Sequence, residues 1–318
     1  MRTGQDLAPG RHGGLELRHP LIVAAGGAGY GNELLESVGE HLPGAIVTRS
    51  ITREARRGAA SPRMMPRSDG LLHAIGTPNA GLEAVLRRQG ERWGASDVPV
   101  IVSLCADNVD DIAALARTLE MHPDASGMEL SLECPDQGRG RQPIGLDVEA
   151  SETATVAARA ATDLPLIVKL SSAAPDIRPI ARAVAAAGAD VVSVSGSVRA
   201  FALDEAGQRP ALGSVYGWLS GPSVKPIGLR LVYEVAQVVR VPVVGAGGVH
   251  TLADVLDYLG AGASAVGLAS AALADPALPG RLGRELEAWG DEHGITEVGQ
   301  LVGRALPQRK DRGSLRRR

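Results

Sequence analysis

Short runs of apolar residues, rich in Val and Ile, recur along the chain, and each is bounded by glycine, proline, aspartate or another polar residue. Continuous apolar runs of this length are typical of parallel strands that are buried on both faces. The pattern predicts eight strands: Pro20–Ala25, Gly44–Thr48, Pro99–Leu104, Gly127–Leu132, Pro165–Leu170, Asp190–Ser195, Val241–Ala246 and Ser264–Leu268.

Helical patterns lie between these runs. Strand and helix therefore alternate, and eight repeats over about 250 residues favour a closed (β/α)8 TIM barrel, an α/β fold, over an open doubly wound sheet. The expected helices are Asn32–Glu40, Ala80–Arg92, Val109–Glu120, Val148–Ala161, Ile177–Ala187, Pro226–Val239, Leu252–Gly260 and Pro279–Trp289.

No linker or shift in composition divides the chain, so we expect one domain over residues 1–306. Two connections between elements are long, residues 49–98 and 196–240. Long loops in a compact domain are usually functional, and in a barrel the loops that follow the strands build the active site.

The composition is that of an ordinary soluble protein: 44% of the 318 residues are hydrophobic, 22% are charged, and the net charge is −3. Apolar runs are too short for a membrane helix, and residues 1–14 lack the apolar centre of a signal peptide, so we expect a cytoplasmic protein with no membrane partner. The near-neutral charge argues against nucleic-acid binding. The basic segment 307–318 is expected to be a solvated, disordered tail rather than a nucleic-acid or membrane arm. The two cysteines lack metal-ligand spacing, and no metal site is expected.

The residues at the ends of the predicted strands are polar or glycine, and they form the candidate site. Lys169 lies inside the apolar run LIVKL, where an inward-facing lysine needs an anion or hydrogen-bond acceptors. It either points outward or contacts a ligand at the barrel mouth. The other strand-end residues are Ala25, Gly26, Arg49, Ser103, the segment 131–136, Ser195, Gly247, Gly248, Ala269 and Ser270.

A glycine turn between a strand and a helix, in VVGAGGVHTLADV (243–255), allows backbone NH groups to approach a phosphate. The loops after strands seven and eight form the usual phosphate site of these barrels, and VGLASAAL (266–273) follows strand eight. The turn is neither a Walker loop nor a good dinucleotide fingerprint.

Cys134 follows the fourth strand and precedes a proline and a glycine-rich polar loop. A thiol at the barrel mouth can act as a general base or a nucleophile. Cys105 is instead expected to be a small buried hydrophobic residue.

At these residues the sequence resembles the dihydroorotate dehydrogenase family, specifically its soluble class with a cysteine base, from about Gly14 to Leu306. The matching stretches are VAAGGAGYG (23–31), VTRSIT (47–52), the pattern R.G..SPR ending at Arg63, AIGTPNAG (74–81), LPLIVKLS (164–171), WLSGPSVKPIGLRLVYEV (218–235) and VVGAGGVHTLADVLDYLGAGASAVGLASA (243–271).

The resemblance implies a TIM barrel that carries FMN at the carboxyl ends of its strands. Cys134 would exchange a proton with the substrate while hydride passes to or from the flavin, and Lys169 would contact the N1 and O2 edge of the flavin ring. By position, the other implied cofactor contacts are Ala25, Gly26, Arg49, Ser50, Ser103, Ser131, Ser195, Gly221, Gly247, Gly248, Ala269 and Ser270.

Departures from the family are concentrated where it binds its pyrimidine substrate. The family's N-x-S-C-P-N motif is replaced by residues 131–136, in which Glu133 and Asp136 are acidic, and His73 replaces an asparagine. Gly196 and Ser197 replace an asparagine and a threonine. His73 is expected to be a wall or substrate contact rather than filler. The full set of expected substrate contacts is Arg49, His73, Ala74, Ile75, Gly76, Thr77, Ser131, Glu133, Asp136, Gly196 and Ser197.

The two acids matter because orotate carries a carboxylate. A like-charge contact at about 4 Å costs on the order of 4 kcal/mol at an effective dielectric constant near 20. Either the acids point away from the ligand or the ligand is not orotate. Carboxylates near Cys134 would also raise the pKa of its thiol, which suits a proton donor in a reduction.

The first hypothesis is therefore an FMN-dependent oxidoreductase that acts on a CH–CH bond next to a carbonyl group of a substrate other than dihydroorotate. The alternatives are a genuine dihydroorotate dehydrogenase and a flavin-binding protein that has lost its chemistry. By family likeness we expect a homodimer, with a second subunit carrying FAD and an iron-sulfur cluster as a further possible partner. The direction of the reaction and the electron acceptor or donor stay open.

Overall fold

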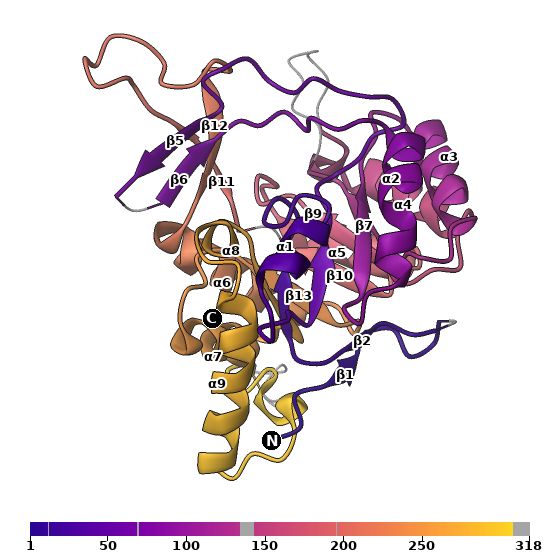
Figure 1. Ribbon diagram of the computed structural model, residues 1–318, viewed down its shortest axis with the longest axis vertical. Coiled ribbons are helices and arrows are strands. Elements are labelled where there is room, and N and C mark those ends of the chain that lie inside the picture. The colour runs from indigo at the N-terminus through magenta and orange to yellow at the C-terminus, as the bar shows by residue number, and fades with distance from the viewer. Residues whose placement is uncertain (12, 69, 134–142, 195, 308–318) are drawn as a thin grey trace, which may run out of the picture.

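The computed structural model describes residues 1–11, 13–68, 70–133, 143–194 and 196–307. Eight parallel strands close into a barrel in the order β10-β13-β14-β3-β4-β7-β8-β9 (Figure 1), which confirms the predicted TIM barrel. Each strand corresponds to one predicted run: β3 (Leu21–Val23), β4 (Ala45–Val47), β7 (Val100–Leu104), β8 (Gly127–Ser131), β9 (Leu166–Leu170), β10 (Val191–Val194), β13 (Val243–Ala246) and β14 (Ala265–Leu268).

The register of three neighbouring strands brings polar residues side by side. Ser131 of β8 pairs with Lys169 of β9, and Lys169 pairs with Ser193 of β10. These residues lie near the carboxyl ends of their strands, so the barrel itself builds one polar layer at its mouth.

All eight predicted helices are present and lie around the strands (Figure 1). Short polar side chains cap several of them: the side chains of Asn108, Asp147 and Thr251 accept hydrogen bonds from backbone NH groups in the first turn of their helices. The helices are α1 (Asn32–Ser37), α2 (Leu82–Gly94), α3 (Val109–Glu120), α4 (Val148–Arg159), α5 (Ile177–Ala186), α6 (Lys225–Ala236), α7 (Leu252–Ala261) and α9 (Leu278–Glu292).

A small antiparallel sheet lies over one end of the barrel (Figure 1) and was not predicted. Its strands come from the two long connections, and their order is β11-β12-β6-β5. Short, half-exposed strands with little alternation, one of them containing Pro66, give weak sequence signals. The strands are β5 (Met64–Arg67), β6 (Gly70–His73), β11 (Val198–Phe201) and β12 (Tyr216–Ser220).

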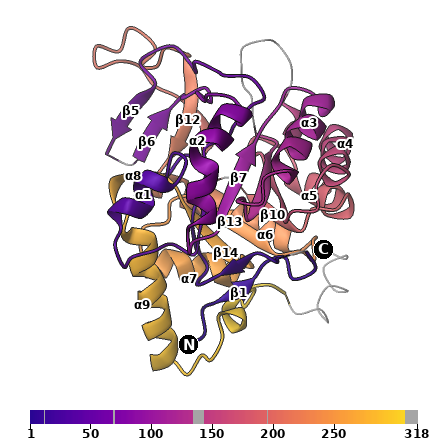
Figure 2. The same ribbon diagram turned by 45° about the vertical axis from the view of Figure 1, so that its right-hand side comes forward.

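A hairpin of β1 (Gln5–Asp6) and β2 (Glu16–Leu17) closes the other end of the barrel (Figure 2). Leu7, Leu15 and Leu17 are buried there in one cluster with Ile101 and Ile167 of the barrel strands. The hairpin was not predicted. The remaining short elements are α8 (Ser270–Ala274), η1 (Ile144–Leu146), η2 (Pro222–Val224) and η3 (Val298–Leu301).

None of the helices in the described part of the chain is both long and apolar enough to cross a membrane. The tail predicted to be disordered lies outside the described residues from residue 308 onward.

Candidate active site

A cavity of about 1000 Å³ lies where the carboxyl ends of the barrel strands meet the small sheet. This size accommodates a cofactor together with a small substrate. Most of the residues predicted from the sequence line it: Ala25, Gly26, Arg49, Ser50, His73, Ala74, Ile75, Gly76, Thr77, Ser131, Glu133, Lys169, Gly196, Ser197, Gly247, Gly248, Ala269 and Ser270.

Two predicted residues lie just behind this lining. Ser103 is fully buried, and its hydroxyl lies 3.0 Å from the hydroxyl of Ser50, which does line the cavity. Gly221 lies against the turn after β13, because a Cβ atom on Gly248 would be 2.8 Å from the Gly221 carbonyl oxygen. Cys134, Asp136 and Ser195 lie outside the described residues.

The glycine turn after β13 is packed tightly against the turn after β10. Gly247 and Gly248 have φ values of 122° and 70°, which side chains rarely tolerate. A Cβ atom on Gly247 would lie only 2.7 Å from the Cα atom of Gly196. Tyr258 of α7 donates hydrogen bonds to the carbonyl oxygens of Ala246 at 3.1 Å and Gly247 at 2.7 Å, which fixes the turn from behind.

The short helix α8 starts at Ser270, directly after β14, and its first residues line the same cavity. Phosphate sites of TIM barrels usually combine the loops after strands seven and eight with such a helix. Gly247, Gly248, Ala269 and Ser270 therefore lie where TIM barrels usually bind phosphate.

Lys169 points into the cavity and is paired with an acid. Its Nζ lies 3.4 Å from Oε2 of Glu133, and the two side chains are only 17% and 12% exposed. The outward orientation left open for Lys169 is excluded, and Glu133 does not point away from the site. The other carboxylate oxygen of Glu133, Oε1, is buried and has no hydrogen-bond partner among the described residues.

A second acid, Glu129 of β8, also lines the cavity and was missed in the sequence. It is 3% exposed and accepts a 2.8 Å hydrogen bond from the Ser103 hydroxyl. Burial raises the pKa of the Glu129 carboxyl, against the opposing effects of Lys169 and of the Ser103 hydrogen bond. A signal existed, because residues 129 and 131 lie on one face of the strand, residue 133 follows just after its end, and all three are polar.

His73 ends β6 in the small sheet and forms part of the cavity wall, opposite Trp218 of β12 in the strand register. Burial lowers the pKa of its imidazole, and the nearby charge of Lys169 lowers it further. The ring is therefore held neutral at neutral pH and can donate one hydrogen bond and accept another.

Four arginines line the outer part of the cavity, and sequence analysis singled out only the first, Arg49. It lies over the ring of Tyr30, with its guanidinium carbon 6.0 Å from the ring centroid. Arg56 pairs with Asp107 at 3.0 Å, and its Nη1 is buried without a hydrogen-bond partner in the described part of the chain. Arg57 and Arg199 are the other two. The cavity lining therefore contains more arginines than acids, and one of these arginines, Arg56, is already paired with Asp107.

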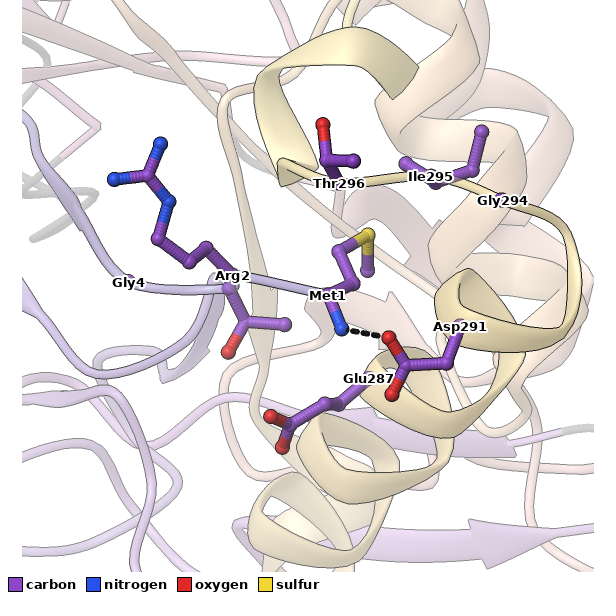
Figure 3. A pocket seen from close by; sticks show the side chains of 9 residues that line it. Met1, Arg2, Gly4, Glu287, Asp291, Gly294, Ile295 and Thr296 are labelled. Atoms are coloured by element: carbon purple, nitrogen blue, oxygen red, sulfur yellow. Dashed lines mark hydrogen bonds and ion pairs between the residues drawn. The ribbon is translucent and has the colours of Figure 1, made fainter.

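A second, shallower hollow lies where the N-terminal residues meet the end of α9 (Figure 3). It is lined by Met1, Glu287, Asp291 and their neighbours, and the Met1 amino group is ion-paired with Asp291. None of the residues that line it belongs to the predicted site.

Comparison with known proteins gives consistent results. The sequence profile of the family described as Dihydroorotate dehydrogenase matches residues 11–289. The chain is 36% identical over 290 residues to the "Dihydroorotate dehydrogenase B (NAD(+)), catalytic subunit" of Pelobacter propionicus, covering 91% of this chain and 95% of that protein. It is 37% identical over 290 residues to the protein of the same name from Geobacter metallireducens, with the same coverage.

Among solved structures, the crystal structure of DHODH in complex with ferulenol from Eimeria tenella is similar, with a TM-score of 0.80. The two chains are 19% identical, and the match covers 96% of this chain and 89% of the other. At that identity the likeness shows a common fold.

Proposed function

The chain belongs to the dihydroorotate dehydrogenase family of CH–CH oxidoreductases, and on that premise we propose that it carries FMN and acts on a CH–CH bond next to a carbonyl group. The observation that carries the proposal is the cavity at the barrel mouth, which is lined by Lys169 together with the glycine turn at Gly247 and Gly248. FMN, when bound, supplies the hydride exchange at its N5 atom.

The residues present fit FMN. Backbone NH groups at Gly247, Gly248 and Ser270 would hold the phosphate, and the close approach of Gly196 to this turn leaves no room there for side chains. Ala25 and Gly26, which follow β3, line the cavity and have only a methyl group and a hydrogen atom as side chains. Lys169 would hold its ammonium group at the edge of the flavin ring where negative charge develops on reduction.

Cys134 is proposed to exchange the proton with the substrate carbon. Glu133, which directly precedes it in the sequence, lines the cavity, and this supports a location of the thiol near the reacting atoms. The Glu133 carboxylate would counter the tendency of the Lys169 ammonium to lower the pKa of a neighbouring thiol, which helps to keep the thiol protonated, as a proton donor requires.

We propose a substrate other than dihydroorotate. Glu133 places a carboxylate in the cavity, and His73 replaces a family amide in its wall. Because Glu133 offsets the charge of Lys169, a substrate carboxylate in the inner cavity gains no net attraction there, whereas a neutral cyclic enone, lactam or imide needs none.

Dihydroorotate oxidation is the second candidate. The names of the relatives favour it, since the match covers 95% of the length of those proteins. The cations of the outer cavity, Arg49 among them, could also hold a carboxylate away from Glu133. Reduction of the bound flavin by dihydroorotate under anaerobic conditions distinguishes the two candidates.

The experiment that tests the proposed chemistry compares the two cysteines. Cys134→Ala and Cys134→Ser should retain FMN, identified after denaturing release, and lose turnover. Cys105→Ala is the matched control, since Cys105 is fully buried and does not line the cavity. This variant should keep both FMN and turnover. Full activity of Cys134→Ala would contradict the role of the thiol. A protein that binds FMN but exchanges hydride with no donor or acceptor would be a flavin-binding protein without the proposed chemistry.

We also propose that the protein is a homodimer in the cytoplasm. A second subunit that carries FAD and an iron-sulfur cluster is proposed as its partner. The words "catalytic subunit" in the relatives' names support the second subunit. Light scattering of the purified chain tests the dimer. Dependence of NAD(+) reduction on an added electron-transfer subunit tests the other partner.

A further inference from the structure

Compared with the family motif, Glu133 adds a charged group to the cavity lining. Glu129, Ser131 and Glu133 alternate along β8 and its extension, and all three line the cavity. The resembling family motif has a serine at the position of Glu133. This chain therefore adds one buried carboxylate at the barrel mouth, and that carboxylate lies against the ammonium group of Lys169 at 3.4 Å.

The cations of the cavity differ in the structural elements that carry them. Of the described lining residues that belong to the eight barrel strands, Lys169 is the only cation. Arg56, Arg57 and Arg199 stand on the long connections and the small sheet, further out, and Arg49 follows β4. A group bound between the barrel strands is therefore expected to lie nearer to Lys169 than to the arginines.

Glu129 and His73 are the other titratable groups whose charges couple to Lys169. Burial favours the neutral form of both, because it raises the pKa of Glu129 and lowers that of His73. Glu133 is paired directly with the ammonium group and carries the opposite charge. The Glu133–Lys169 pair thus sets the local charge of the inner cavity close to zero.

We propose that Glu133 is a positioning residue that acts through Lys169: it offsets the lysine charge and so lowers the reduction potential of the bound flavin. The inference rests on the proposed FMN site. Two-electron reduction adds negative charge to the flavin ring, and a nearby unpaired ammonium stabilises that charge, whereas a carboxylate beside the ammonium reduces this stabilisation. A lower potential favours delivery of hydride from flavin to substrate over its removal from substrate.

The test measures the flavin itself in the holoprotein. The midpoint potential and the sulfite dissociation constant are determined for the wild type, Glu133→Gln, Glu133→Ser and the control Glu287→Gln. Sulfite is an anion that adds to flavin N5, so its affinity follows the local positive charge. The control removes a carboxylate from the hollow beside α9, outside the flavin cavity.

Both Glu133 variants should favour reduced flavin by about tenfold, which is about 30 mV for a two-electron couple. Their sulfite dissociation constants should fall by about tenfold, and Glu287→Gln should match the wild type. A purely structural role of Glu133 would move neither quantity in this direction.

Unchanged potentials and sulfite affinities in both FMN-loaded variants would overturn the inference and leave the proposed function standing. Loss of FMN from both variants would also overturn it, because Glu133 would then hold the cofactor site together. A wild-type protein that takes up no FMN would instead contradict the proposed function itself, so the two failures are distinguishable.

Discussion

Tyr258 reaches from the middle of α7 to the turn after β13, where its hydroxyl donates a 2.7 Å hydrogen bond to the carbonyl oxygen of Gly247. The side chain is fully buried, and burial raises the pKa of its hydroxyl, so the donor stays protonated. A core residue on a helix thereby fixes the backbone turn proposed to hold the flavin phosphate.

Tyr258→Phe should therefore weaken FMN binding and lower the free energy of unfolding. The substitution leaves the carbonyls of Ala246 and Gly247 without this donor, which costs about 1–3 kcal/mol. Urea denaturation and FMN titration measure the two effects. Tyr233→Phe, on α6 and outside the cavity lining, is the control and should leave FMN affinity unchanged. Wild-type FMN affinity in Tyr258→Phe would show that the turn does not depend on this hydrogen bond.

Gly247→Ala should abolish FMN binding. The added methyl group would lie 2.7 Å from the Cα atom of Gly196, at a φ of 122° that alanine rarely adopts. Gly260→Ala is the matched control, because a Cβ atom there meets nothing within 4 Å and the residue lies inside α7. That variant should keep FMN and gain up to about 1 kcal/mol of stability. FMN uptake is followed by fluorescence quenching, and normal uptake by Gly247→Ala would refute the phosphate site.

Glu129→Gln should become more stable than the wild type as pH rises. The pKa of Glu129 is raised in the folded state by burial, so its contribution to stability is fully present below its unfolded value of about 4.5 and is lost as pH rises through the folded value. Glutamine removes this loss. Urea unfolding of both proteins between about pH 4 and 8 measures the difference, and a difference that does not change with pH would contradict the buried, protonated state.

Restoring two family residues should improve orotate binding. The double variant Glu133→Ser and His73→Asn removes the carboxylate that offsets the Lys169 charge and returns an amide to the cavity wall. Orotate should bind to its FMN-loaded form at least about tenfold more tightly than to the wild type, about 1.4 kcal/mol. Difference spectra of the flavin during orotate titration measure this. Equal affinity in both proteins would mean that neither residue determines the ligand.

The barrel was predictable because its strands are buried on both faces, so each appears in the sequence as a continuous apolar run. Val100–Leu104, for example, is buried at every position. The small sheet was not predictable, because Met64–Arg67 is a short, mostly exposed strand and because the sheet depends on pairing of β6 with β12, which lies far away in the sequence. Hydrophobic periodicity carries no information about such long-range pairing.

The site was predictable as a set of strand-end residues but not as a set of contacts. Lys169 and Glu133 were both identified from their positions, yet their ion pair depends on the register of β8 and β9. Glu129 was overlooked because it lies inside its strand, whereas candidate residues were sought at the strand ends; the inward face of the strand also lines the cavity. Arg57 and Arg199 come from loops whose path the sequence does not specify.

Anaerobic addition of dihydroorotate to the FMN-loaded wild type tests the central claim most directly, with the flavin absorbance as the readout. We expect no bleaching by dihydroorotate, and we expect the photoreduced flavin to be reoxidised by at least one compound in a panel of neutral cyclic enones, lactams and imides. Rapid, stoichiometric bleaching by dihydroorotate would contradict the account and identify the protein as a dihydroorotate dehydrogenase.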